Sequence, residues 1–462
     1  MSTITAPTYD PTSTAQALAQ KATASAQSAL TTDTTTAKAV ATALSKLGSA
    51  ISTFQNSLST LTGTGKTLLS QSATLSDSTY GSASASGRAV AGTYDFFVSQ
   101  VATAGQAKYS NLTDTSGASG ASGTLRVKAG SGSFEVDLGQ AAGDATLTVR
   151  ELAAAINNAS GNAGKVSASV VTFGTNTQLV LNSTQTGEAS TVSLDLTDVA
   201  AGTLKSALGD PANVSTTTPR DAIVWVGGKS GTQVKQPSNT FTNVDGLAVT
   251  FSKAQLDTEA NLTVTVKTDN SGTAANVKSF VDAYNSLKKT LDGLVASANA
   301  DTGTAAGAFA SDAGVLALQA RLVTLLRPAG GGSTLASFGI TAQRDGTLAL
   351  DTTRLDKQLA LQPDGLDRLL GSTSTGNTSG IAGALDTYLD QWSGISGQLK
   401  QRTDANGKQQ TALTKRQTDL DSKYNTAYDR YLKQFTALQT LQSTMNSNVS
   451  LFDALFSSDK SS

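Results

Sequence analysis

The chain of 462 residues contains neither cysteine nor histidine. Without cysteine there can be no disulfide bonds, thiolate nucleophiles or cysteine-ligated metal sites. Without histidine, the Ser–His and Cys–His catalytic pairs and histidine-ligated zinc are excluded as well. The enzyme mechanisms left are those that carboxylates, lysine or tyrosine run alone. We therefore expect a protein that is not an enzyme and that carries no cofactor.

The chain is also poor in charge. Charged residues make up 15% of it and the net charge is -1, whereas soluble domains typically contain about 25% charged residues. No basic stripe or patch suggests binding to nucleic acid or to an anionic membrane. There is no apolar run of about 18 residues that could span a bilayer, and the first residues lack the basic and apolar segments of a Sec signal peptide. We therefore expect neither nucleic acid nor membrane as a partner.

A search for binding and catalytic motifs finds no phosphate-binding GxxxxGK[ST], no dinucleotide-binding GxGxxG between a strand and a helix, and no calcium loop. Five aspartates each lie next to an expected strand, where a surface or turn carboxylate is the common case. They are Asp95, Asp137, Asp144, Asp195 and Asp245. The sequence thus predicts no catalytic, cofactor-binding or metal site.

The strongest periodic signal is in the last expected helix, at about 398–456. Tyr424, Tyr431, Leu438, Met445 and Phe452 recur every seven residues, and a second row contains Leu413, Leu420, Ala427, Leu441 and Leu455. This is the a/d alternation of a coiled coil, interrupted by the polar residues Gln434 and Asn448. Two interpretations stay open, a core helix docked on its own domain and an interaction helix.

A matching seam of apolar residues lies near the start of the chain. Residues 1–36 are rich in Ser, Thr, Ala and Gln and are expected to be flexible in isolation, or helical once a partner is present. From residue 37 the apolar spacing of four and three predicts an amphipathic helix, which Gly63 and Gly65 weaken. Because this seam matches the C-terminal one in period, the two helices could wrap together.

Between these ends the pattern changes to that of strands, and then to helices again. Strands are expected at 92–101, 123–128, 133–138, 166–171, 178–181, 222–226, 240–251 and 261–268. Helices are expected at 146–159, with Thr146 or Thr148 as the cap, and after Ser311 or Asp312. An Asp-Gly pair at 345–346 predicts a hairpin.

The sequence therefore predicts an α+β multidomain protein in which a coiled-coil-like helical domain, built from both chain ends, carries inserted β-rich domains. The expected segments are a flexible segment at 1–36, a helical leg at 37–73, a β-rich middle domain at 74–110 and 218–270, an inserted β-rich domain with one helix at 111–217, a helical domain with a β-hairpin at 271–397, and a coiled-coil helix at 398–462.

Several stretches, in this order and spacing, resemble the flagellar filament cap family, also called flagellar hook-associated protein 2. They include ALSKLGSAISTFQNSLSTL (43–61), GTYDFFVSQVATAGQ (92–106), TLTVRELAAAINNA (146–159), DAIVWVGG (221–228), VKSFVDAYNSL (277–287), FGITAQRDGTLALD (338–351) and LFDALF (451–456). One departure is the Thr/Ala/Gln-rich start, where the family usually has a short Gly/Ser-rich apolar motif.

The resemblance implies a secreted, non-enzymatic protein that leaves through flagellar type III export and acts at the filament tip. It implies a homo-oligomeric, pentamer-like ring that promotes flagellin polymerisation and prevents monomer leakage. The other implied partners are flagellin, the hook–filament junction protein and an export chaperone, and the inserted domain would carry a flagellin-like IN motif. The implied partner-binding residues of the helical legs are Leu44, Leu47, Ile51, Phe54, Leu58, Tyr431, Leu438, Leu441, Met445, Phe452 and Leu455.

Two alternatives remain. A flagellin-like axial protein would share heptad ends around an inserted middle, but its two ends should be more balanced than these. A surface adhesin binding host glycans would need exposed aromatic residues in the β-rich part, for which Tyr94 and Trp225 are the candidates.

Overall fold

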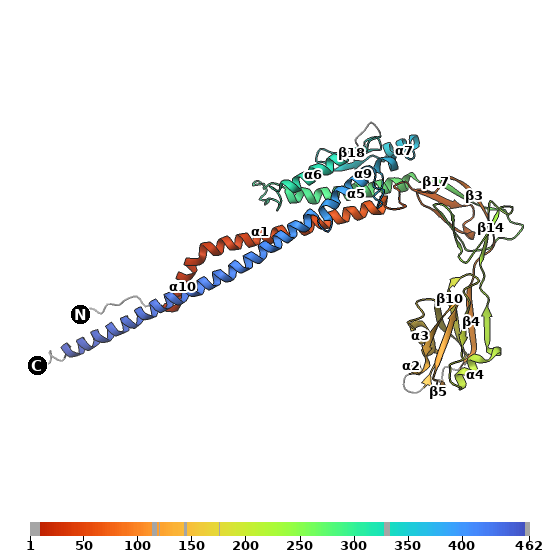
Figure 1. The fold of residues 1–462 in the computed structure, drawn as a ribbon, viewed down its shortest axis with the longest axis horizontal. Helices are drawn as coiled ribbons and strands as arrows, with labels where there is room; N and C mark the ends of the chain where they lie inside the picture. Colours follow the sequence, from red (N-terminus) through yellow and green to blue (C-terminus); the bar gives the residue numbers. More distant parts are fainter. Residues whose placement is uncertain are drawn as a thin grey trace. The chain divides into compact units, whose positions relative to one another are not determined.

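The structure, a computed structural model, describes residues 10–112, 118–119, 121–142, 146–174, 176–327 and 333–457. The chain divides into two compact units. One is helical and contains both chain ends, residues 1–66 and 274–462, and the other is rich in strands and contains residues 67–273. The predicted α+β class, with a helical domain built from both ends and β-rich material inserted between them, is confirmed (Figure 1).

The helical unit is built around two long helices, α1 (Pro11–Thr62) and α10 (Gln398–Ser457), which run side by side (Figure 1). Its other elements are α5 (Asn270–Val295), α6 (Ala313–Leu325), α7 (Thr352–Leu361), α8 (Gly365–Leu370), α9 (Gly380–Ser393) and the hairpin β18 (Ile340–Ala342) and β19 (Leu348–Leu350). The hairpin turns at Gly346, whose φ of 80° is the left-handed conformation that the Asp-Gly signal predicts.

Helix α1 begins much earlier than the sequence predicts. The flexible segment was expected to reach residue 36, whereas the helix starts at Pro11; residues 1–9 lie outside the described residues. The Asp10 side chain caps it by accepting hydrogen bonds from the backbone N–H groups of Thr12 and Ser13. Ala15 and Ala19 are fully buried. Small side chains let two helices approach closely, so this stretch is stabilised by a distant part of the chain, which local composition does not reveal.

The apolar seam of α1 lies in the core of the helical unit. The Phe54 ring packs against two aromatic rings of α5, with centroids 6.5 Å from Phe280 and 6.3 Å from Tyr284. Gln55, on the neighbouring face, donates hydrogen bonds to Asp386 and Asp390 of α9. Helix α1 is therefore fixed in this half by α5 and α9.

The β-rich unit contains two lobes. In the first, a five-stranded sheet faces a three-stranded one, and every pair of neighbours is antiparallel. The five strands, in spatial order, are β1 (Gln71–Leu75), β17 (Leu262–Thr268), β3 (Gly92–Gln100), β13 (Ala222–Val226) and β14 (Thr232–Gln236); the three are β15 (Thr240–Val244), β16 (Leu247–Phe251) and β2 (Gly81–Ala85). Phe96, Phe241 and Phe251 meet between the two sheets.

The second, inserted lobe has its own core. A four-stranded sheet has the order β12 (Val214–Thr217), β4 (Ala104–Leu112), β10 (Asn176–Thr186) and β9 (Val166–Phe173), and a three-stranded sheet has the order β11 (Val192–Asp195), β6 (Thr124–Ala129) and β7 (Gly132–Asp137). The remaining elements are β5 (Ala118–Ser119), β8 (Thr146–Leu147), α2 (Leu138–Ala142), α3 (Val149–Asn158) and α4 (Thr203–Gly209). The boundary expected at 110/111 cuts β4. Because β4 pairs with β10 and β12, this lobe begins near Ala104.

Two open choices of helix cap are resolved. Thr148 caps α3 in a capping box with Glu151, and the Asp312 side chain caps α6. Residues 328–332, which follow α6 at a short distance, lie outside the described residues.

Candidate functional site: the terminal helix α10

Helices α1 and α10 pack in antiparallel orientation. The side-chain amides of Gln27 and Gln417 exchange two hydrogen bonds, of 3.1 and 3.0 Å. Farther along, Asn406 is buried and donates to the carbonyl oxygen of Ala37 at 3.0 Å. Along the same stretch lies a small apolar cluster of Leu30, Ala37, Leu413 and Leu420. Leu413 and Leu420 belong to the predicted second heptad row, so this part of the row is satisfied within the chain.

The base of α10 is anchored to the helical unit by Arg402. Its guanidinium pairs with Asp312, the residue that caps α6, and lies over the Trp392 ring of α9 at 5.3 Å from the ring centroid. The hydrogen bond from Arg402 lowers the pKa of the Asp312 carboxyl below its ordinary value, and the α6 backbone N–H of Val315 adds to the effect. The helices α6, α9 and α10 therefore meet at one cation, which anchors the start of α10.

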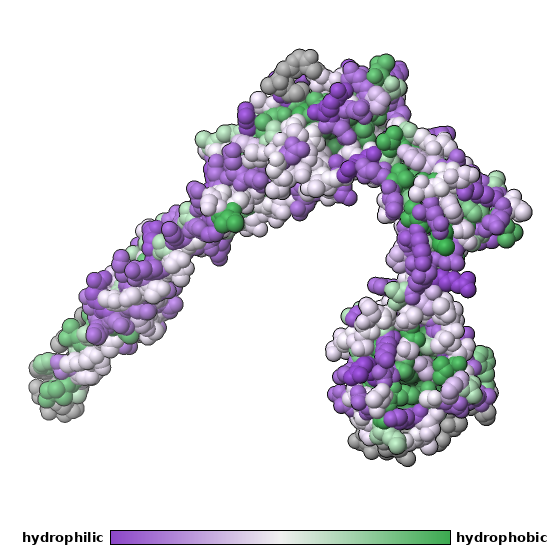
Figure 2. All heavy atoms as spheres, turned by 45° about the vertical axis from the view of Figure 1, so that its right-hand side comes forward, coloured by the Kyte–Doolittle hydropathy of each residue, from purple (hydrophilic) through white to green (hydrophobic). Residues whose placement is uncertain are grey.

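Beyond α1, α10 continues with an exposed apolar face. Since Gln27 lies opposite Gln417 and the helices are antiparallel, Asp10 lies opposite about residue 434. Past that point Leu441, Met445 and Phe452 are 56%, 51% and 56% exposed. Figure 2 shows hydrophobic residues gathering toward the free end of this helix. Leu438 and Leu455 are also exposed and continue the two heptad rows. We call this exposed apolar face the open seam: Leu438, Leu441, Met445, Phe452 and Leu455.

The structure separates the predicted partner-binding residues into buried, half-buried and exposed ones. Five are buried inside the helical unit and present no surface to a partner: Leu44, Leu47, Ile51, Phe54 and Leu58. Tyr431 is half-buried, and the guanidinium of Arg430 lies 4.9 Å from its ring centroid. The other five form the open seam. A proposed partner surface is therefore carried by α10 alone.

The sequence analysis missed the polar contacts that fix this arrangement. Gln417 continues the first heptad row of α10 toward the start of the helix, but its position in the sequence does not reveal its pairing with Gln27, and that of Arg402 does not reveal its pairing with Asp312. The available signal was a glutamine on each helix at a position facing the seam. Such a pair is informative only when the antiparallel register is known.

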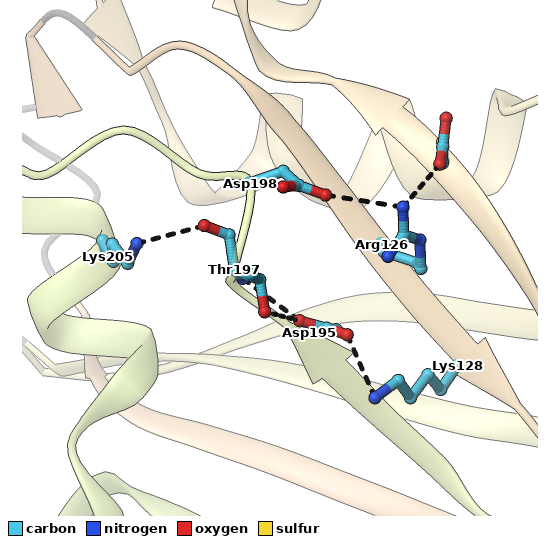
Figure 3. Close-up of polar contacts among 7 residues, drawn as sticks. Arg126, Lys128, Asp195, Thr197, Asp198 and Lys205 are labelled. Atoms are coloured by element: carbon cyan, nitrogen blue, oxygen red, sulfur yellow. Dashed lines mark hydrogen bonds and ion pairs between the residues drawn. The ribbon is translucent and has the colours of Figure 1, made fainter.

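A polar cluster on the inserted lobe is the second candidate site. Figure 3 shows its members Arg126, Lys128, Asp195, Thr197, Asp198 and Lys205. Arg126 pairs with Glu135 and Asp198 at 3.0 and 3.4 Å, and Lys128 pairs with Asp195 at 3.0 Å. The Thr197 hydroxyl and then Lys128 hold the pKa of Asp195 far below its usual range. Lys205 donates to the carbonyl oxygens of Thr197 and Val199. The cluster contains three cations and three carboxylates, so it presents no excess charge to a ligand.

Within the described ranges, no three carboxylates lie close enough together to hold a metal ion. No helix in these ranges is long and apolar enough to cross a membrane. The residues singled out by geometry are those of the open seam.

The chain is similar in sequence to known proteins. Residues 8–105 match the family model for the flagellar hook-associated protein 2 N-terminus, and residues 220–447 match that for its C-terminus. A lateral flagellar hook-associated protein 2 from Vibrio parahaemolyticus is 31% identical over 83% of this chain and 86% of its own length. The chain belongs to the flagellar hook-associated protein 2 family. A B-type member of the family from Pseudomonas aeruginosa is 30% identical over 79% of this chain and 78% of its own.

The fold is also that of a solved relative. A crystal structure of the flagellar cap protein FliD from Escherichia coli, containing three domains, superposes with a TM-score of 0.57 at 24% identity, covering 79% of this chain and 99% of its own. The stretch between the two family matches, residues 106–219, corresponds closely to the inserted lobe. The C-terminal match ends at residue 447, so Phe452 and Leu455 of the open seam lie beyond it.

Proposed function

We propose that this chain caps the distal end of a flagellar filament, where it promotes flagellin polymerisation and prevents monomer leakage. Membership in the hook-associated protein 2 family supports this role, and the shared fold with a flagellar cap protein is consistent with it. The role is structural and not enzymatic. It requires secretion, which we assign to flagellar type III export, and places the protein at the filament tip.

The observation that carries the proposal is the open seam. A helix anchored at Arg402 and paired with α1 extends well past the end of α1, leaving large apolar side chains in water. Contiguous exposed apolar surface on a helix is typical of a docking site for another amphipathic helix. We assign flagellin as its partner during assembly. The hook–filament junction protein before assembly begins, and an export chaperone before secretion, are further partners of the same kind.

The cap is proposed to be a homo-oligomeric, pentamer-like ring. A ring places several α10 helices around one filament end, so that each weak contact is reinforced by the others. The two alternatives, a flagellin-like axial protein and a glycan-binding adhesin, are not favoured by the family assignment. Tyr94, a candidate aromatic for glycan binding, donates its hydroxyl to the carbonyl oxygen of Val90.

The test is a gene deletion followed by complementation. The deletion strain should release unpolymerised flagellin into the medium and lack filaments, and the intact gene should restore both. A Leu441→Ser/Met445→Ser double variant should be secreted but should not restore filaments. The matched control, Thr440→Ala/Ser447→Ala, changes exposed polar residues of the same helix segment and should restore them.

Normal filaments in the deletion strain would refute the cap role. Full restoration by the double variant, at equal secretion, would refute the role of the open seam while leaving the cap role intact.

A further inference from the structure

Strand β9 forms one edge of the four-stranded sheet of the inserted lobe. It pairs only with β10 in the described residues, with Phe173 opposite Asn176 and Val171 opposite Gln178. In an antiparallel strand the backbone N–H and C=O groups of alternate residues point to opposite sides. One set of residues therefore bonds to β10, and the set between them points away from the sheet.

Two asparagine side chains block the first half of this edge. The Asn157 amide donates to the carbonyl oxygen of Ala168 and accepts from its N–H, both at 2.8 Å. The Asn162 amide makes the same pair of hydrogen bonds with Val166, both at 2.9 Å, and is itself buried. Each amide thus takes the place of a neighbouring strand. The backbone groups of Val166 and Ala168 point away from β10. Because this direction alternates along the strand, the next residues whose backbone groups point away are Val170 and Thr172.

The second half of the edge is open. In the part of the chain that the structure describes, no hydrogen bond is made to the outward backbone groups of Val170 and Thr172. Alongside them, Val171 is 36% exposed and Phe173 is 63% exposed. An edge with unpaired backbone groups and apolar side chains is a template for another strand. Natural edges are usually protected by lysine, proline or a bulge, and Val166–Phe173 contains no charged residue and no proline.

We propose that this open edge pairs with the same edge of a second copy of the chain, antiparallel and centred on Val171. In this register Val170 of each copy faces Thr172 of the other, so the two outward residues of each strand are both hydrogen-bonded. A register shifted toward the start of β9 would need the backbone N–H and C=O of Ala168, and both already hydrogen-bond to the Asn157 side chain. A shift in the other would bring Gly174 into the pair, where the chain already turns with a φ of 60°. Asn157 and Asn162 therefore help to fix the register of the pairing between the two β9 strands, and they limit how many residues can pair.

The composition of the edge favours a second copy as the occupant. An antiparallel pair about a two-fold axis needs a self-complementary edge, and Val170 and Thr172 supply one. Neither β9 nor β10 contains a charged residue, so two copies approach without like-charge repulsion. Pairing would also place Val171 against Val171 of the second copy and Phe173 against its Ser169, which covers both exposed apolar side chains. This pairing is independent of the open seam and of the proposed capping role.

The absence of cysteine from the natural chain makes a direct test possible, since a single introduced cysteine can form a disulfide only with a second copy. In the proposed register Val171 faces itself as a non-hydrogen-bonded pair, with Cα atoms about 4.5 Å apart, within the roughly 4.4–6.8 Å that a disulfide requires. The full-length Val171→Cys variant, oxidised mildly and run on a non-reducing gel, should therefore form a linked dimer.

Ser169→Cys is the matched control, because Ser169 is an exposed residue on the same face of the same strand. In the proposed register two such cysteines would be about 13 Å apart along the strands, too far for a disulfide. Dimer yield should be at least about tenfold lower than for Val171→Cys. A second variant, Val171→Cys/Thr172→Pro, removes one outward N–H at an edge position that tolerates proline, and should lose the dimer while remaining folded by circular dichroism.

A Val171→Cys protein that forms no disulfide-linked dimer would overturn the proposal, and is also the result expected if the edge accepts a strand from a different protein. Equal cross-linking of the two single-cysteine variants would indicate random collision and would overturn it too. Persistence of the dimer in the proline variant would refute the hydrogen-bonded register.

Discussion

The two halves of the α10 seam should respond differently to the same substitution. Leu413 is 5% exposed and packs with Leu30 of α1, whereas Leu441 occupies the same heptad row and is 56% exposed. Truncating a buried leucine to alanine costs about 2–5 kcal/mol. The lower end applies to Leu413, because a two-helix interface can collapse onto a small cavity. Truncating Leu441 should change stability by less than about 0.5 kcal/mol.

Hydrogen–deuterium exchange of peptides from α10 is the suitable assay, because the paired helices can open without unfolding the rest of the chain. A loss of about 2 kcal/mol corresponds to about 30-fold faster exchange. Leu413→Ala should therefore accelerate exchange about 30-fold in peptides near residues 406–424, and Leu441→Ala should change it less than about threefold. Equal acceleration by the two variants would refute the division of the seam into a covered and an open half.

Three further outcomes are expected. Gly187→Ala should lower the melting temperature of the β-rich unit, since the glycine has a φ of 101° and an added Cβ would lie 2.4 Å from the Pro237 side chain; an unchanged melting curve would contradict this contact. Asp312, whose pKa Arg402 lowers, should contribute stability that is present above about pH 4 and is lost as the pH falls below it. Asp312→Asn should therefore flatten the acid limb of a stability–pH profile, and an unaltered acid limb would count against the ion pair. Phe54→Ala should cost about 3–5 kcal/mol in chemical denaturation, and a cost under about 1 kcal/mol would show that the ring is not a core residue.

Periodicity predicted much of the fold, but not which helix would cover which face. Apolar spacing indicated the helix ending at Thr62 and the helix α10, and the structure pairs these two helices in antiparallel orientation. The same spacing could not assign Phe54 to a core or to a partner surface. That depends on Phe280 and Tyr284, more than 200 residues away in sequence.

Local composition misjudged the start of the chain for a related reason. Residues 11–36 contain few large apolar side chains, which is typical of a segment that cannot fold alone. Their order comes from α10, against which Leu30 packs and with which Gln27 exchanges two hydrogen bonds. The blocked edge of β9 was equally hidden, because Asn157 and Asn162 in sequence look like ordinary residues at the end of a helix and in a turn.

The division of α10 also bears on how selective its open seam can be. A partner that covered the open seam with apolar residues alone would remove water from Gln434 and Asn448, which lie on the second heptad row with Leu441 and Leu455. Neither amide would gain a hydrogen bond in return, which costs about 1–3 kcal/mol for each buried polar group. A partner with a polar side chain opposite each amide avoids that cost, as Gln27 does for Gln417 within the chain. The intramolecular half of the seam thus indicates the rule for the open half: apolar residues supply the affinity, and polar positions select the register and the partner.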